Sequence, residues 1–304
     1  MNTEKVSVII PVYNEGKSIG DLVSQIKSCY PDFDVIVIDD GSNDNTADAA
    51  QVAGAQVYSH AYNIGNGAAI KSGIRVADSD ILVFMDGDGQ HDPEDIANLL
   101  EYMPEFDMVV GARSMGDQAS LWRAAGNKAY NWFASYVAKF PIQDLTSGFR
   151  AVKSNIAKSF VYLLPNTYSY PATITLGVLR SGMSVKYVPI KMRKRTTGKS
   201  NIKLIQDGVR FFIIITRICT LYSPMRVFLP VSFTMFLLGV ANYLYTYITR
   251  SRFTNMSVFM FVAAIIVFMM SLISEQICQM RFERRGAVRP IKKTASQSEE
   301  LTGS

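Results

Sequence analysis

The sequence has little cysteine and no pattern of paired cysteines. Its 304 residues include only Cys29, Cys219 and Cys278, which are far apart and have no histidine close by in the sequence. An odd number of scattered cysteines is typical of neither a disulfide framework nor a zinc site. The cysteine content therefore favours a reducing compartment for the part of the chain that lies in water.

A strong charge excess is also missing, and no leader segment is expected. Lysine and arginine number 31 against 26 aspartates and glutamates, and the first two hundred residues contain no basic patch interleaved with aromatics. This composition predicts no dedicated nucleic-acid binding. Residues 1–5 lead directly into an apolar strand pattern, so we expect no signal peptide.

Two common nucleotide-binding motifs are absent as well. The run from Gly65 to Ile70 has two glycines but lacks the third glycine of a dinucleotide fingerprint. The tripeptide Gly198-Lys199-Ser200 lacks the upstream glycine of a P-loop. Neither segment predicts a classical dinucleotide or P-loop site.

The first two thirds of the chain contain a regular alternation of strand and helix patterns. Short apolar runs at residues 6–10, 35–38, 56–58, 81–85 and 109–110 are separated by helical patterns, at a spacing of about 25 residues. This alternation predicts an α/β domain with a parallel sheet covered on both faces. Acidic residues follow three of these strands, and they are Glu15, Asp39, Asp40, Asp86 and Asp88. Because ligands bind at the carboxyl ends of such strands, we expect these carboxylates to meet at one edge.

The segment around Asp86 and Asp88 carries the clearest chemistry. Carboxylates at positions i and i+2 of an extended chain point the same way, and Gly87 and Gly89 let a ligand approach the backbone. Hard oxygen ligands suit Mg²⁺ or Mn²⁺, which also bind substrate phosphates. The pattern predicts a divalent ion held against a diphosphate, and the alternative is an acidic turn after a strand.

A basic segment at residues 191–203 has two interpretations. It reads Lys-Met-Arg-Lys-Arg-Thr-Thr-Gly-Lys-Ser-Asn-Ile-Lys. One interpretation is a phosphate clamp that faces the acidic edge. The other is a solvated or membrane-facing basic loop.

The last third of the chain contains long apolar runs. Residues 227–248 and 256–274 carry no charge, and each run is long enough to cross a bilayer. Residues 203–221 place their charged side chains near one stripe, which predicts a helix in the membrane interface or, alternatively, a core helix. A buried soluble hairpin is the alternative for the two spans. Glu275 is expected at a helix end, facing the interface.

Charge around the hairpin predicts its orientation. Its short link holds two arginines, whereas both outer flanks are richer in lysine and arginine, so both ends are expected in the cytoplasm. We therefore expect a catalytic domain at 1–202, an interfacial helix at 203–222 and a transmembrane hairpin at 223–280. The tail at 281–304 is basic and polar, and it is expected to be disordered.

Five ordered motifs in the first 205 residues resemble one enzyme family. They are Pro11-Val12-Tyr13-Asn14-Glu15, Asp39-Asp40-Gly41-Ser42, Asn63-x-Gly65-x-Gly67, Asp86-x-Asp88-x-Gln90 and Thr146-Ser147-Gly148-Phe149-Arg150. Together they resemble the family 2 glycosyltransferases of the GT-A fold. The subgroup that they resemble most is the polyprenyl-phosphate glycosyltransferases, similar to dolichol-phosphate mannose synthase and its two-span bacterial relatives.

The resemblance implies roles for individual residues. The nucleotide sugar would be held by Pro11, Tyr13, Glu15, Asp39, Asp40, Lys71, Asp86, Gln90, Arg195 and Ser200. A Mg²⁺ or Mn²⁺ ion would be surrounded by Asp86, Asp88 and Gln90, and the acceptor phosphate would be gripped by Arg113, Arg123 and Asn127. The residues implied in catalysis are Asp88, Arg123, Asp144 and Arg195.

Three positions carry qualifications. The resemblance implies that a loop with Arg195, Gly198 and Ser200 closes over the donor. Asn201 stands where the family commonly has a lysine in this loop, so Lys199 or Lys203 would take the place of that lysine. Asp144 is expected to orient a sugar hydroxyl or an arginine, or else to cap a turn. His91 is expected to be a structural neighbour of the acidic turn, with a ligand role as the alternative.

The implied reaction is inverting transfer of one hexose from a UDP- or GDP-linked donor to polyprenyl phosphate. It would take place at a membrane, with a bacterial plasma membrane favoured, and a homo-oligomer is compatible with it. The acceptor phosphate is already anionic near neutral pH, so a strong general base is not needed. One alternative is a processive polysaccharide synthase, but two spans make a poor channel and no Gln-x-x-Arg-Trp motif follows Asp144. The other alternative is a non-catalytic sugar-nucleotide sensor.

Overall fold

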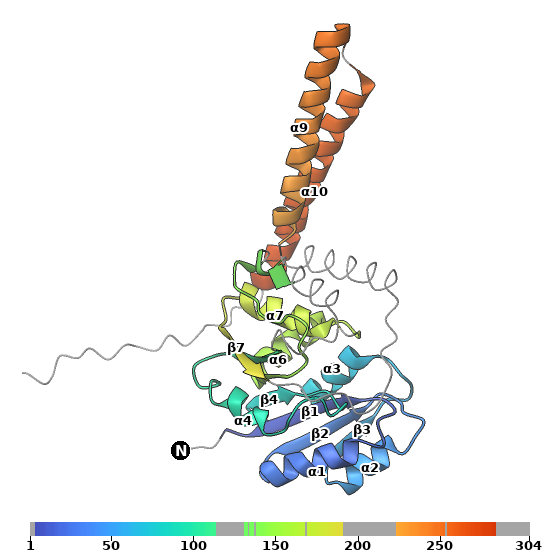
Figure 1. Ribbon diagram of the computed structural model, residues 1–304, viewed down its shortest axis with the longest axis vertical. Coiled ribbons are helices and arrows are strands. Elements are labelled where there is room, and N and C mark those ends of the chain that lie inside the picture. Colours follow the sequence, from blue (N-terminus) through green and yellow to red (C-terminus); the bar gives the residue numbers. More distant parts are fainter. Residues whose placement is uncertain are drawn as a thin grey trace, which may run out of the picture.

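The computed structural model describes residues 4–113, 131–132, 134–136, 138–167, 169–190, 223–252 and 254–283, which form an α/β domain followed by a helical hairpin (Figure 1). The elements in chain order are β1 (Val6–Val12), α1 (Ile19–Cys29), β2 (Asp34–Asp39), α2 (Thr46–Val52), β3 (Gln56–Ser59), α3 (Asn66–Val76), β4 (Ile81–Phe84), α4 (Asp95–Leu100), β5 (Met108–Arg113), β6 (Arg150–Lys153), α6 (Ser154–Phe160), the 3₁₀ turn η1 (Val161–Leu163), α7 (Tyr170–Arg180), β7 (Val185–Ile190), α9 (Pro224–Arg250) and α10 (Asn255–Glu283).

The seven strands form one sheet in the order β3-β2-β1-β4-β6-β5-β7. The pairs β1–β2, β2–β3, β1–β4 and β5–β7 are parallel, as the alternating pattern predicts. Strand β6 is the exception, because it runs antiparallel to both β4 and β5. The sheet is therefore mostly parallel, with one reversed strand between β4 and β5.

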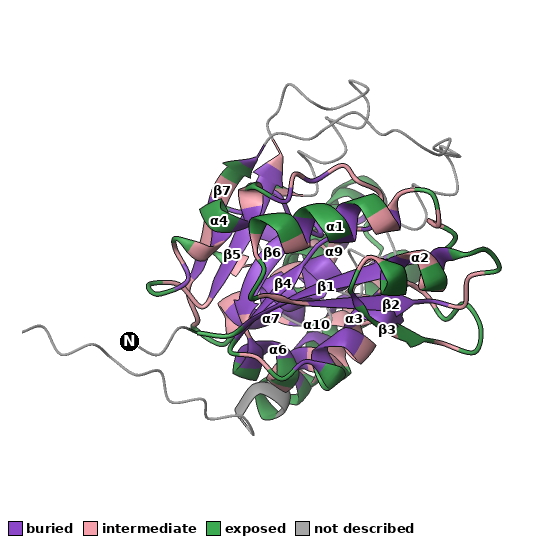
Figure 2. Ribbon diagram, turned by 90° about the horizontal axis from the view of Figure 1, so that it is seen from below, coloured by how far each residue is buried: buried purple, intermediate pink, exposed green. Residues whose placement is uncertain are grey.

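Alternating side chains of the strands build a core on each face of the sheet. In β1, Val8 and Ile10 belong to the same buried cluster as Ile26 of α1, whereas Ile9 belongs to the cluster that contains Ile70 of α3. Successive residues of a strand point to opposite faces, so one strand supplies both cores. Helices α1, α2 and α4 cover one face, and α3, α6 and α7 cover the other (Figure 2).

The order of the strands creates a switch point beside β1. The chain passes from β1 to β2 on one side, whereas β4 pairs with β1 on the other side. In open α/β sheets, ligands bind beyond the carboxyl ends of the strands at such a point. The fold therefore directs attention to the loops after β1, β2 and β4.

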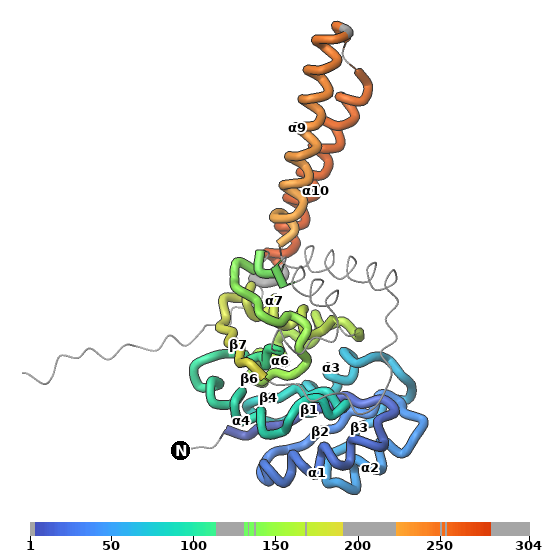
Figure 3. Tube along the Cα trace, in the orientation of Figure 1, coloured from blue at the N-terminus to red at the C-terminus, as the bar shows by residue number. Residues whose placement is uncertain are grey.

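Helices α9 and α10 form the hairpin, which extends away from the sheet on the side of α7 (Figures 1 and 3). Their segments Pro224–Thr249 and Asn255–Met280 have mean hydropathies of 1.8 and 2.7, and only 11% and 17% of these windows are buried. Each is long and apolar enough to cross a membrane. The low burial opposes the alternative of a soluble core hairpin.

The structure corrects the expectation for Glu275. This residue lies inside α10, eight residues before the last helical residue, rather than at a helix end. Its Oε1 accepts a hydrogen bond from Nη2 of Arg180, the last residue of α7, at 2.8 Å. Its Oε2 accepts a weaker bond from the backbone N–H of Met225, at 3.3 Å. Glu275 thus joins the hairpin to the α/β domain.

Candidate active site

The loops beyond β1, β2 and β4 enclose a pocket of about 300 Å³. Its lining residues come from segments that are distant in sequence, and they are Pro11, Val12, Tyr13, Glu15, Asp40, Asn63, Gly65, Asn66, Asp86, Gly87 and Asp88. Six of the residues singled out in the sequence therefore meet in one place: Pro11, Tyr13, Glu15, Asp40, Asp86 and Asp88. Four of the five carboxylates that were expected at one edge of the sheet line this pocket, and Asp39 is the exception.

Reciprocal hydrogen bonds fix the loop after β1 against the loop after β2. The backbone N–H of Asn14 donates to Ser42 Oγ at 2.8 Å, and Asn14 Oδ1 accepts from the backbone N–H of Asn43 at 2.9 Å. Asn14 has φ of 56°, a left-handed conformation that asparagine tolerates better than most residues. The backbone N–H of Glu15 donates to Thr46 Oγ1 at 2.9 Å. These bonds hold Tyr13 and Glu15 at the pocket.

Asp39 and Asp40 follow β2 but have different surroundings. Asp39 Oδ1 accepts hydrogen bonds from the backbone N–H of Ser42, at 3.0 Å, and from its hydroxyl. Asp39 thus closes its own turn and is not among the residues that line the pocket. The Asp40 carboxylate accepts the backbone N–H groups of Ile64 and Gly65, at 3.0 and 2.7 Å, and faces the pocket.

The Asp86-Gly87-Asp88 turn is packed tightly from two sides. A Cβ at Gly87 would lie 2.5 Å from Val12 Cγ1, and a Cβ at Gly148 would lie 2.6 Å from Asp86 Oδ2. Contacts this short require glycine at both positions. Asp88 Oδ1 accepts the backbone N–H of Gln90 at 3.1 Å. Gln90 itself is not among the lining residues.

The carboxylates of Asp86 and Asp88 fit a hard divalent ion. Both line the same pocket, although the residues described here include no cluster of three histidine, cysteine, aspartate or glutamate side chains able to hold a metal. A full set of protein ligands is not needed, because Mg²⁺ usually keeps several waters and binds through one or two carboxylates together with substrate phosphates. The donor set therefore suits an ion that arrives with a diphosphate.

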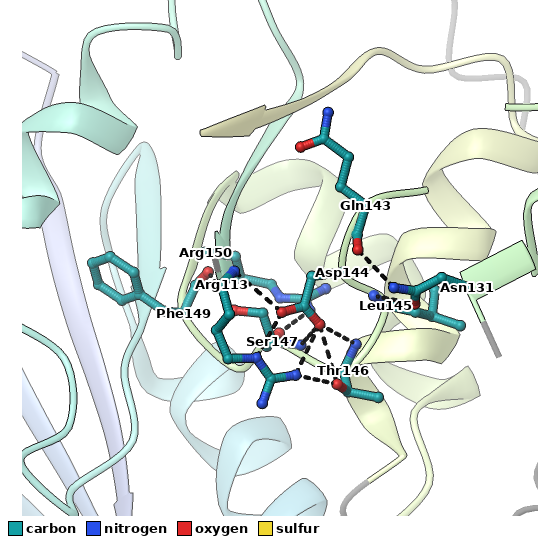
Figure 4. Close-up of polar contacts among 9 residues, drawn as sticks. All are labelled: Arg113, Asn131, Gln143, Asp144, Leu145, Thr146, Ser147, Phe149 and Arg150. Atoms are coloured by element: carbon teal, nitrogen blue, oxygen red, sulfur yellow. Dashed lines mark hydrogen bonds and ion pairs between the residues drawn. The ribbon is translucent and has the colours of Figure 1, made fainter. Parts of the chain in front are cut away.

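Asp144 pairs with Arg113, the last residue of β5 (Figure 4). Arg113 Nε donates to Oδ2 at 2.7 Å and its Nη2 to Oδ1 at 2.9 Å, while the backbone N–H groups of Thr146 and Ser147 donate to Oδ1 at 3.1 Å. Burial acts to raise the pKa of Asp144, but the bonds from Arg113 outweigh it, so the pKa lies below its usual range. Two of the roles open to Asp144 match these contacts, because its carboxylate both orients Arg113 and caps the turn that follows it.

The same ion pair brings positive charge toward the acidic turn. Hydrogen bonding to Asp144 is the main cause that raises the pKa of Arg113, and the charge of Asp86 adds to it. Arg113 keeps 27% of its side chain exposed, so it is both fixed and accessible. An anion close to Asp86 would therefore meet a guanidinium that is already oriented.

Arg150, the first residue of β6, is fully buried beneath this region. Its guanidinium donates to the carbonyl oxygens of Pro171, at 2.9 Å, and Ser147, and to Thr175 Oγ1, at 2.9 Å. Burial lowers the pKa of Arg150. Arg150 thereby ties the segment that carries Gly148 to the first turns of α7.

His91 has the structural position that the sequence suggested. Its ring stacks on Phe149 with centroids 4.8 Å apart and an interplanar angle of 17°. Burial lowers its pKa to about 4, so the ring is neutral near pH 7. His91 thus packs beneath the turn after β4.

The remaining predicted residues divide into two groups. Lys71 donates to Asn166 Oδ1 and is not among the lining residues. The second group lies outside the described part of the chain and consists of Arg123, Asn127, Arg195, Gly198, Lys199, Ser200, Asn201 and Lys203. The expected interfacial helix at 203–222 also lies outside it. Their predicted roles stay predictions.

Sequence reasoning missed one group at the site. His60, directly after β3, contacts Asp40 with Nδ1 at 2.7 Å and Ser72 Oγ with Nε2 at 2.8 Å. The three residues belong to three different elements, and no motif spacing joins them. The only signal in the sequence is a lone histidine at the carboxyl end of a strand.

Comparisons with known proteins identify a family for the α/β domain and for the hairpin. Residues 7–159 match the model of glycosyl transferase family 2, and residues 223–280 match the model of the GtrB C-terminal hairpin. The undecaprenyl-phosphate mannosyltransferase of Micrococcus luteus is 30% identical over 65% of this chain and 87% of that protein. The polyprenol monophosphomannose synthase of Mycolicibacterium smegmatis is 30% identical over 66% of this chain and 82% of that protein.

A solved structure supports the fold. Glucosyl-3-phosphoglycerate synthase from Mycobacterium tuberculosis, in complex with Mn²⁺, UDP-glucose and phosphoglyceric acid, matches with a TM-score of 0.58. The match covers 71% of this chain and 79% of that one at 19% identity, so it bears on the fold alone. The family model spans half of the chain and covers β1 from its second residue, strands β2 to β6, the acidic turn and the pocket described above. This chain therefore belongs to glycosyl transferase family 2 and is a glycosyltransferase.

Proposed function

We propose that this enzyme transfers a single hexose, with inversion, from a nucleotide sugar to polyprenyl phosphate at the cytoplasmic face of a bacterial plasma membrane. The observation that carries the proposal is that an acidic pocket at the sheet edge and an apolar hairpin occur in one chain. Relatives named for undecaprenyl and polyprenol phosphate support the same acceptor class.

The donor binds in the pocket between the loops after β1, β2 and β4. Pro11, Tyr13 and Asp40 surround the nucleoside, and the acidic turn lies beside the diphosphate, an arrangement supported by the shared pocket. A UDP- or GDP-linked sugar fits this scheme. A solved structure of the same fold contains UDP-glucose, which supports a nucleotide sugar as the donor.

Asp86 and Asp88 would hold Mg²⁺ or Mn²⁺ against the diphosphate, with Gln90 close by. When bound, the ion supplies positive charge to a leaving nucleoside diphosphate. Structures of the same fold with Mn²⁺ or Mg²⁺ and UDP support this use of a divalent ion. The chain's own part is to fix the two carboxylates: Gly148 leaves room for the carboxylate of Asp86, and Gly87 lets the turn pack on Val12.

The acceptor needs orientation more than activation. A phosphate monoester has a second pKa near 6 and is already anionic at neutral pH. Arg113, held by Asp144, directs positive charge at the acceptor phosphate so that its oxygen lies in line with the anomeric carbon. Attack on the face opposite the leaving group inverts that carbon. Arg123 and Asn127 complete the acceptor site, and Arg195 and Ser200 close over the donor.

The hairpin brings the catalytic domain to its lipid substrate. Arginines of the link at residues 250–252 lie at one end, and the larger number of lysines and arginines flanks the other end. By the positive-inside rule, the domain and both termini are cytoplasmic. The chain divides into a domain at 1–202, an interfacial helix at 203–222, a transmembrane hairpin at 223–280 and a tail at 281–304.

The test is transfer of label from radioactive nucleotide sugars to undecaprenyl phosphate by the full-length protein in detergent with Mn²⁺ or Mg²⁺. We expect label from one donor in the organic phase, as one sugar per lipid, and loss of transfer with a chelator and in Asp88→Asn. Asp78→Asn serves as the matched control, because Asp78 is exposed in the loop after α3. Polymeric product would identify a processive synthase. Nucleotide binding without transfer to any lipid would identify a sensor.

A further inference from the structure

A chain of three polar side chains runs from the pocket into the fold. It begins at Asp40 in the pocket, passes through His60 at the end of β3, and ends at Ser72 in α3. The distances are 2.7 Å from Asp40 Oδ1 to His60 Nδ1 and 2.8 Å from His60 Nε2 to Ser72 Oγ. The backbone N–H of His60 donates to the carbonyl of Asp39 at 2.8 Å, which fixes the start of the imidazole side chain.

The chemistry of the three groups permits one arrangement of protons for a neutral ring. An ionised carboxylate only accepts hydrogen bonds, so His60 Nδ1 must carry the proton that faces Asp40. Nε2 is then an acceptor, and the hydroxyl of Ser72 must donate to it. Asp40 therefore selects the tautomer in which His60 donates to it, and the hydroxyl of Ser72 holds the ring in that orientation through Nε2.

This arrangement leaves part of Asp40 available to a ligand. Asp40 Oδ1 accepts from His60 and from the N–H of Ile64, while Oδ2 accepts from the N–H of Gly65. A carboxylate has about four lone-pair sites, so the groups named leave one, on Oδ2. The side chain is 4% exposed and lines the pocket, so that site is directed at a ligand rather than at bulk water.

We propose that His60, with its ring held by Ser72, is a positioning residue that holds Asp40 to accept a ring N–H of the donor's nucleobase. The inference rests on the proposed nucleotide-sugar donor and deepens it. Uracil and guanine carry such a ring N–H, whereas cytosine and adenine present an unprotonated ring nitrogen there. Asp40 thus selects UDP- or GDP-linked donors against CDP- and ADP-linked ones.

Two substitutions of His60 separate this role from simple packing. Asparagine places its amide nitrogen where Nδ1 lies and can still donate to Asp40. Glutamine places its amide nitrogen near Nε2, toward Ser72, and cannot replace the bond to Asp40. The matched control for Ser72→Ala is Ser24→Ala, because Ser24 is an exposed helical serine of α1 whose hydroxyl donates to the carbonyl of Gly20.

The measurements are donor KM and kcat of the full-length enzyme, competition by UDP, GDP, CDP and ADP, and the thermal unfolding midpoint. We expect His60→Gln to raise donor KM about tenfold, as loss of a hydrogen bond to a charged group requires, with kcat changed by less than about twofold. His60→Asn should stay within about threefold of the wild type. Ser72→Ala should raise donor KM by a smaller factor, and Ser24→Ala should not raise it.

Competition by the four diphosphates tests the selectivity. We expect the wild type to bind UDP or GDP at least about tenfold more tightly than CDP and ADP, and His60→Gln to narrow that ratio. CDP competing as well as UDP and GDP would overturn the proposal. Equal donor KM in His60→Asn and His60→Gln, with both midpoints lowered alike, would show a packing role and would also overturn it.

The outcomes separate this inference from the proposed function. A wild-type protein that binds none of the four diphosphates and transfers no sugar refutes the proposed function itself. A wild type that binds and transfers normally, with variants that match it, refutes only the role of His60. If His60→Gln fails to fold, Ser72→Ala decides, because a donor KM that is unchanged after loss of the bond holding the ring contradicts a positioning role of His60.

Discussion

Replacing Gly148 by alanine tests whether the geometry of Asp86 governs activity. The new Cβ would lie 2.6 Å from Asp86 Oδ2 and 3.1 Å from its Cγ, about 0.8 Å short of the 3.4 Å at which ordinary contact begins. Gly148 has no positive φ, so alanine adds this collision and no backbone strain. The short carboxylate of Asp86 must therefore move by most of an ångström.

The size of the effect follows from that displacement. A functional side chain has to stay within about 0.5 Å of its productive position, and a misplacement of about 1 Å can cost two orders of magnitude in rate. We therefore expect kcat/KM of Gly148→Ala to fall by about 10- to 100-fold. We also expect low concentrations of added Mn²⁺ to activate the variant less than they activate the wild type. The unfolding midpoint should change little, because the collision is relieved by a side chain at the pocket.

The assay is transfer of label to undecaprenyl phosphate across a Mn²⁺ titration, with circular dichroism to confirm folding. Gly20→Ala is the matched control, because its Cβ would meet only the carbonyl of Ala49 at 3.5 Å, an ordinary contact within the packing of α1. Gly148→Ala with kcat/KM within twofold of the wild type would refute the reasoning. An equal loss in Gly20→Ala would do the same.

Two further predictions concern ion pairs away from the pocket. Glu275→Ala leaves Arg180 without its carboxylate at a half-buried junction, so we expect the midpoint to fall by an amount equivalent to about 1 to 2 kcal/mol. The double variant Arg180→Glu with Glu275→Arg should restore part of the lost midpoint, because the two charges are exchanged. A midpoint that stays as low as in Glu275→Ala would contradict a direct ion pair. Burial tends to raise the pKa of Asp107, but bonds from Ser184 and Lys153 lower it below its usual value. A depressed carboxyl pKa stabilises the fold above the unfolded pKa of about 4 and loses that effect as pH falls through the folded pKa. Asp107→Asn should therefore lower the free energy of unfolding by about 1 to 2 kcal/mol at pH 7 and by much less below pH 4. Denaturant melts at the two pH values measure this, and an equal loss of stability at both would contradict the prediction.

The parallel part of the sheet could be predicted because local and tertiary signals agree there. The strand at Val6–Val12 is buried along its whole length, and its apolar run stands out in the sequence. Asp86 and Asp88 follow a buried strand in the same way. When strands are parallel and their crossovers short, placing a carboxylate at a strand end also places it at the common edge.

The reversed strand could not be predicted for the opposite reason. Strand β6 has four residues and begins with Arg150, a residue that rarely lies fully buried. Its direction is set by pairing with β4 and β5 on either side, and that pairing depends on contacts far apart in sequence. The bonds of His60 to Asp40 and of Glu275 to Arg180 are hidden for the same reason. Local periodicity contains no information about which distant polar groups meet.

Helix α7 connects the hairpin with the segment that packs against the pocket. Its first turns accept the hydrogen bonds of Arg150, at the carbonyl of Pro171 and the hydroxyl of Thr175. Its last residue, Arg180, binds Glu275 of the hairpin. At 1.5 Å per residue, these 11 residues span about 16 Å along one rigid rod. The same guanidinium of Arg150 also binds the carbonyl of Ser147, next to the glycine that packs on Asp86. A single helix fixed at both ends thus connects the segment that packs on Asp86 with the hairpin, which under the proposed function would hold the donor pocket at a constant distance from the membrane.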